Sequence, residues 1–172
     1  MTSTRTSMSS RSLGPVRRAA FVLLAAAGVT LSPLPAQASG GGGDTAVAAA
    51  PAPAPTQAAQ TAVDTALAQQ GDPYVWGAAG PDSFDCSGLT QYAYAAAGIS
   101  LPHSSSMQST MGTPVAYADL QPGDLVFFYT PVSHVGMYIG NGQMVHAGTS
   151  GDVVKVVELA YMPDFNSARR IA

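Results

Sequence analysis

The 172-residue sequence has a single cysteine, Cys86, and few positive charges outside residues 1–38. One cysteine cannot form a disulfide within the chain, and it excludes a zinc site built from several cysteines. Only three basic residues follow residue 38, against ten acidic ones, so the net charge of this part is 3 − 10 = −7. So few cations cannot form the basic surface that neutralises phosphates, and we therefore expect no nucleic-acid partner.

The N-terminal segment lacks an apolar run long enough to cross a membrane, which takes about 20 residues. Its apolar run lies at 19–29, after four arginines, and is followed by two prolines and Ala36-Gln37-Ala38. This order of features is typical of a secretory signal peptide. We predict a signal peptide over residues 1–38, cleaved after Ala38, and a secreted protein with no stable membrane anchor. Arg17-Arg18 leaves open whether the general or the twin-arginine machinery exports it.

Residues 39–55 are rich in glycine, alanine and proline, a composition typical of a linker that is first flexible and then extended. Residues 56–172 have the length of one domain with its own core, and they show no internal repeat. We therefore predict one folded domain. Any wall-binding or regulatory partner would be a separate protein.

The pattern of apolar residues in this domain predicts helices first and strands afterwards. Helices are expected over 56–70 and 87–97, with a short helical turn over 104–111, and a glycine follows each of them. Strands are expected over 125–128, 135–139, 143–147, 153–158 and 165–171. Short links between the strands favour an α+β fold in which N-terminal helices pack on an antiparallel sheet.

The lone cysteine of an exported protein has three possible roles: a buried inert thiol, an intermolecular link or a reactive nucleophile. Free cysteine is among the most buried residue types, which favours a buried inert thiol. Cys86, however, lies at the predicted start of a helix, where unpaired N–H groups and the helix dipole stabilise a thiolate. The same N–H groups could bind an oxyanion formed at the sulfur. This position favours the nucleophile.

A base for this thiol is expected from two histidines on consecutive strands, His134 and His146. We predict a three-residue turn, Gly140-Asn141-Gly142, with Ile139 opposite Gln143, which puts both rings on the same face of the sheet. A plain two-residue turn would put them on opposite faces. His134 would then accept the thiol proton, and His146 would fix the orientation of its ring.

Zinc is the competing interpretation of the same three side chains, because cysteine and histidine are both zinc ligands. None of the usual local ligand spacings is present, so we expect no metal and no cofactor.

Several ordered motifs between about residue 62 and the C-terminus resemble the NlpC/P60 cysteine peptidases, papain-like enzymes of the bacterial cell wall. The motifs are Pro73-Tyr74-Val75-Trp76-Gly77, Phe84-Asp85-Cys86-Ser87-Gly88-Leu89, the segment 120–128, the segment 134–140 and Val145-His146-Ala147. The resemblance implies a papain-like fold. It also implies Cys86 as nucleophile, His134 as base and His146 as the third, orienting residue.

The resemblance further implies three residues on the substrate side of the site. Tyr74 would donate to the oxyanion or to a substrate carbonyl, and Asp85 and Ser87 would contact the substrate beside the nucleophile. Each also has a structural reading: Tyr74 as core packing, Asp85 as a helix N-cap, and Ser87 as a residue of the first helical turn.

Two positions depart from the family pattern: Ala78 replaces a usual glycine, and His103 replaces a frequent arginine. Loss of that arginine puts a contact with a substrate carboxylate in doubt, and it leaves His103 as an alternative base.

The activity implied is hydrolysis of amide bonds in the peptide stems of peptidoglycan, with the stem peptides as partner and the bacterial exterior or cell wall as location. The expected bond joins the γ-carboxyl of D-glutamate to the following diamino acid. Two alternatives are an N-acetylmuramoyl-L-alanine amidase with the same thiol chemistry and a non-catalytic wall-binding protein.

Overall fold

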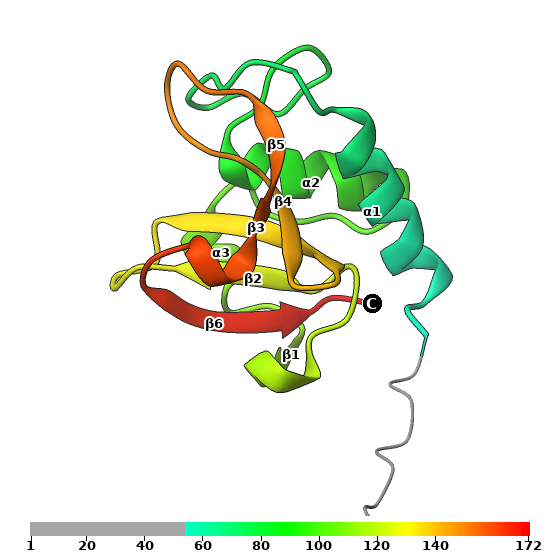
Figure 1. Cartoon of the computed structure of the whole chain (residues 1–172). Helices are drawn as coiled ribbons and strands as arrows, with labels where there is room; N and C mark the ends of the chain where they lie inside the picture. The colour runs from blue at the N-terminus through cyan, green and yellow to red at the C-terminus, as the bar shows by residue number, and fades with distance from the viewer. Residues whose placement is uncertain (1–53) are drawn as a thin grey trace, which may run out of the picture. The chain divides into compact units, whose positions relative to one another are not determined.

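The computed structural model describes residues 54–172, which form helices packed on one antiparallel sheet (Figure 1). The predicted signal peptide and all but two residues of the predicted linker lie outside the described residues. No helix between residues 54 and 172 is both long enough and apolar enough to cross a membrane.

Three α-helices precede or flank the strands, and their bounds are α1 Gln57–Ala68, α2 Cys86–Ala96 and α3 Ser105–Gln108. The strands are β1 Thr113–Val115, β2 Leu125–Phe128, β3 His134–Gly140, β4 Gln143–Ala147, β5 Val154–Glu158 and β6 Phe165–Arg170. Their order in the sheet is β1-β6-β2-β3-β4-β5. The predicted α+β class, helices first and antiparallel strands afterwards, is confirmed.

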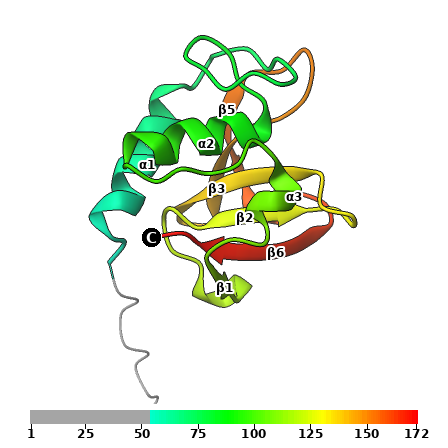
Figure 2. The ribbon, with the colours of Figure 1, turned by 180° about the vertical axis from the view of Figure 1, so that it is seen from behind.

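Each long helix begins at a side-chain cap. The Thr56 hydroxyl accepts from Ala59 N–H at 3.1 Å, and the Asp85 carboxylate accepts from Gly88 N–H at 2.7 Å. Such caps satisfy N–H groups that have no partner within the helix. The two helices pack against each other and against β3, on one side of the sheet (Figures 1 and 2).

The sheet is buried on both faces in its centre, which explains the unbroken apolar run of β2. Leu125 and Phe127 belong to the cluster of buried residues beneath α1 and α2, whereas Val126 and Phe128 belong to a second cluster with Leu159. Successive strand residues point to opposite faces, so a run of four apolar residues requires cover on both sides.

The turn between β3 and β4 differs from the prediction. It has two residues, Asn141 and Gly142, both with positive φ, and Gly140 rather than Ile139 pairs with Gln143. The register shifts between Tyr138 and Gly140, which leaves Ile139 as the extra residue of a β-bulge. A two-residue turn alone would put the two histidines on opposite faces of the sheet. The extra residue of the bulge returns them to the same face, as predicted.

Candidate active site

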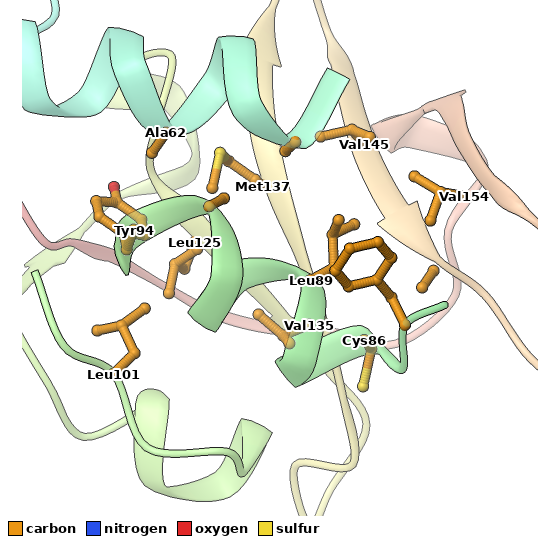
Figure 3. Packing of buried hydrophobic residues seen from close by; sticks show 14 of the residues in the cluster. Ala62, Cys86, Leu89, Tyr94, Leu101, Leu125, Val135, Met137, Val145 and Val154 are labelled. Carbon is orange, nitrogen blue, oxygen red and sulfur yellow. The ribbon is translucent and has the colours of Figure 1, made fainter. Parts of the chain in front are cut away.

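Cys86 is the first residue of α2, directly after the Asp85 cap. Its side chain lies at the end of the main buried cluster, with the sulfur pointing away from the other labelled side chains (Figure 3). The residue keeps 8% of its surface exposed. The thiol is therefore packed on one side and accessible on the other.

His134 and His146 are bound to each other in the described structure. His134 Nε2 lies 2.9 Å from His146 Nδ1, and both residues are buried. This bond leaves Nδ1 of His134 as its free ring nitrogen. Within residues 54–172, no cluster of three or more histidine, cysteine, aspartate or glutamate side chains has the arrangement of a metal site. The two facing nitrogens form a hydrogen-bonded pair, which fits a base and an orienting residue.

Burial favours the uncharged forms of both the Cys86 thiol and the His134 imidazole. Burial raises the pKa of the Cys86 thiol above its ordinary value of 9.0, although N–H groups of Val135, Ser87 and Cys86 itself oppose the rise. Burial and the neighbouring His146 lower the pKa of His134 from 6.5 to about 4. The stabilisation expected at the helix start is thus present, and burial opposes it.

Two hollows meet at Cys86. The wide hollow, of about 400 Å³, is lined by Tyr74, Cys86, His134, His146 and Asp152 among others. The narrow hollow, of about 180 Å³, is lined by Asp85, Cys86, Ser87, His103, Ser104 and Ser105 among others. Cys86, Trp76 and Ser133 line both. All six residues predicted for the site therefore line two hollows that meet at Cys86, which together are called the cleft below.

Asp85 is held by four groups of the protein. Its carboxylate accepts from Gly77 N–H at 2.9 Å, from Gly88 N–H at 2.7 Å and from the Ser87 hydroxyl at 3.1 Å, and His103 Nε2 lies 2.9 Å from both oxygens. Burial opposes ionisation, but the bonds from Gly88 and His103 outweigh it and lower the pKa of Asp85. The structure therefore shows Asp85 as the N-cap of α2, one of the two roles considered for it above.

His103, considered above as an alternative base, is placed with Asp85 in the narrow hollow rather than with the other two histidines. Its Nε2 is occupied by the carboxylate. Ser87, in turn, is buried in the first turn of α2 and donates its hydroxyl to Asp85.

Tyr74 lies in the wide hollow with its phenol available as a donor. Burial, the Cys86 sulfur and the Asp85 carboxylate raise its pKa above 10.0, so the hydroxyl keeps its proton at neutral pH. The main chain of Tyr74 is fixed as well, because its N–H donates to the Asp152 carbonyl at 2.9 Å. Asp152 was not predicted as a site residue, because it stands in the loop between β4 and β5 without any motif around it.

Comparison with known proteins identifies a family for the part of the chain that contains these site residues. The model of the NlpC/P60 family matches residues 71–167, more than half of the chain. A probable endopeptidase of Corynebacterium glutamicum is 51% identical over 111 residues, which are 64% of this chain and 53% of the relative. A probable endopeptidase of Mycobacterium tuberculosis is 52% identical over 108 residues, 63% of this chain and 28% of that protein. The chain thus spans about half the length of one curated relative and less of the other.

Solved structures show the same fold. The peptidoglycan hydrolase RipB of Mycobacterium tuberculosis superposes with a TM-score of 0.61 at 35% identity, over 67% of this chain and 65% of that one. The P60 domain of an antigen from M. avium subspecies paratuberculosis gives a TM-score of 0.62 at 33% identity, over 67% of this chain and 95% of that one.

Proposed function

Because the chain belongs to the NlpC/P60 family, we propose that it is a peptidoglycan endopeptidase whose nucleophile is the Cys86 thiol. The observation that carries this proposal is the cleft itself: the thiol at a helix N-terminus and the hydrogen-bonded His134–His146 pair line the same hollow. A nucleophile, a base within the same hollow and a group that orients the base are the components of nucleophilic acyl transfer.

The first step is attack of the Cys86 sulfur on the carbonyl carbon of the substrate amide. The thiol proton passes to Nδ1 of His134, whose Nε2–H then donates to Nδ1 of His146. In this proposal, N–H groups at the start of α2 and the Tyr74 hydroxyl stabilise the negative charge on the carbonyl oxygen.

The second step breaks the carbon–nitrogen bond and leaves a thioester on Cys86. His134 returns its proton to the leaving amine, so that this amine departs uncharged. A water molecule then gives a proton to His134 and attacks the thioester, which releases the acid and restores the thiol. No metal or cofactor takes part in these steps.

The substrate we propose is the peptide stem of peptidoglycan, cut between the γ-carboxyl of D-glutamate and the following diamino acid. The relatives, a probable endopeptidase and a peptidoglycan hydrolase, support peptidoglycan as the substrate, and the resemblance of the motifs around Cys86 to the NlpC/P60 family supports the choice of bond. The composition of residues 1–38 supports secretion as the route to this substrate.

Product analysis on purified cell wall tests the proposal. Mass spectrometry of the released fragments should find a new amino terminus on the diamino acid. A new amino terminus on alanine would instead identify an N-acetylmuramoyl-L-alanine amidase. Binding to the wall without any released fragment would identify a non-catalytic protein and contradict the proposal.

A further inference from the structure

The wide hollow contains one carboxylate that the proposed reaction does not use, that of Asp152. The two histidines of this hollow are uncharged at neutral pH, since burial lowers the pKa of each to about 4. Tyr74 keeps its proton, because burial raises its pKa. Among the described residues that line the wide hollow, Asp152 is therefore the side chain with a full negative charge.

The position of Asp152 is fixed by its main chain. Its carbonyl accepts from Tyr74 N–H at 2.9 Å, and its own N–H donates to the Thr149 carbonyl at 3.0 Å. Gly148 lets the carboxylate approach the site, because a Cβ there would lie 2.8 Å from Asp152 Oδ2 and 3.6 Å from Cε1 of His146. The negative charge is thus held beside the ring of His146.

The chemistry of the reaction assigns the two hollows to the two sides of the scissile bond. His134 must reach the leaving nitrogen to return its proton, so the leaving amino acid occupies the hollow that contains His134. The narrow hollow contains neither His134 nor His146 and receives the acyl side. This assignment rests on the proposed function.

We propose that Asp152 selects the leaving amino acid by binding the ammonium group of its side chain. In the free protein Lys155 Nζ lies 2.6 Å from Asp152 Oδ2, and Val153 N–H donates to Oδ1 at 2.9 Å. A carboxylate offers about four acceptor positions, so a second cation can bind without displacing Lys155. The occupant is a diamino acid with a free side-chain amine, matched by charge to the carboxylate of this hollow.

The expected preference is modest, because 28% of the Asp152 side chain is exposed to solvent. Ion pairs of this exposure contribute up to about 1 kcal/mol, which corresponds to about a fivefold difference in rate at low substrate concentration. The preference should decrease with added salt, as for any exposed pair.

The test compares stem peptides that differ only in the leaving residue: lysine, norleucine, which lacks the amine, and Nε-acetyl-lysine, which lacks the charge. The quantity measured is the ratio of kcat/KM for lysine to that for each uncharged residue. This ratio does not depend on the fraction of correctly folded enzyme. The wild-type chain should favour lysine about fivefold over both, and Asp152→Asn should bring both ratios close to one.

Asp82→Asn is the matched control, because it removes the same charge from an exposed loop residue that lines neither hollow. This variant should keep the wild-type ratios. Equal rates on all three peptides in the wild type, or unchanged ratios in Asp152→Asn, would overturn the role of Asp152 while leaving the endopeptidase proposal intact. A wild-type chain that cleaves none of the peptides and releases nothing from cell wall would contradict the proposed function itself.

Discussion

Mild acid should destabilise this fold, because unfolding frees two histidines that burial keeps uncharged. His134 and His146 are 8% and 6% exposed, and the pKa of each falls from 6.5 to about 4 on folding. Between these two values the unfolded chain binds more protons than the folded chain. The free energy of unfolding therefore rises with pH across this window and falls as the pH is lowered through it.

The size of the effect follows from the two pKa values. Moving from pH 7.5 to pH 5 should lower the free energy of unfolding by ~2 kcal/mol for one histidine, and by up to ~4 kcal/mol if both titrate independently. The carboxylates of Asp85 and Asp152, whose pKa values are lowered from 3.8, contribute little in this range because they stay ionised at pH 5. The two histidines thus account for the expected loss between these pH values.

Urea unfolding of the full chain at pH 5 and pH 7.5 measures this difference. A His134→Asn/His146→Asn double variant serves as the comparison, because asparagine is polar but does not titrate. It differs from the wild type only at positions 134 and 146, so a difference in pH dependence between the two proteins arises at these two residues. Equal stability of the wild type at both pH values, or an equal loss in the double variant, would refute the reasoning.

Two further substitutions test the packing of the fold. Gly88→Ala should lower the free energy of unfolding by about 2–3 kcal/mol, since its new Cβ would overlap the carbonyl oxygen of Ala78 and the backbone cannot move aside easily. Thermal unfolding followed by circular dichroism measures the loss, and an unchanged Tm would contradict it. Arg170→Met should cost about 3 kcal/mol because it leaves the carboxylate of Asp124, which is 2% exposed, without its paired cation. Arg169→Met, which removes a neighbouring cation with no ion-pair partner in the described structure, is the control and should cost clearly less.

The two long helices could be predicted from the sequence because their apolar residues recur at helical spacing. Five of the six strands could be predicted as well, among them β2 from its short apolar run after a turn. β1 was missed, since Thr113–Val115 is short, contains a proline and lies at the sheet edge, where no apolar alternation is required. The β3–β4 turn was misassigned because turn residues alone do not distinguish a three-residue turn from a two-residue turn beside a bulge.

That Cys86 and the two histidines lie together could also be predicted, because each stands in a local motif. What the motifs could not give depends on how distant segments pack. Burial raises the pKa of the Cys86 thiol, and this burial arises from several elements together. Asp152 reaches the cleft only because its loop is bonded to Tyr74, which lies far away in the sequence.

The nucleophilic role of Cys86 is tested most directly by the rate at which a Cys86→Ala variant cleaves a defined stem peptide. Removal of one sulfur atom leaves the cap, the histidine pair and both hollows in place, so circular dichroism and urea unfolding should show a folded protein. We predict a loss of at least about a thousandfold in kcat/KM, as for other enzymes that lose their nucleophile. A folded Cys86→Ala protein that cleaves the peptide at the wild-type rate would contradict the central claim.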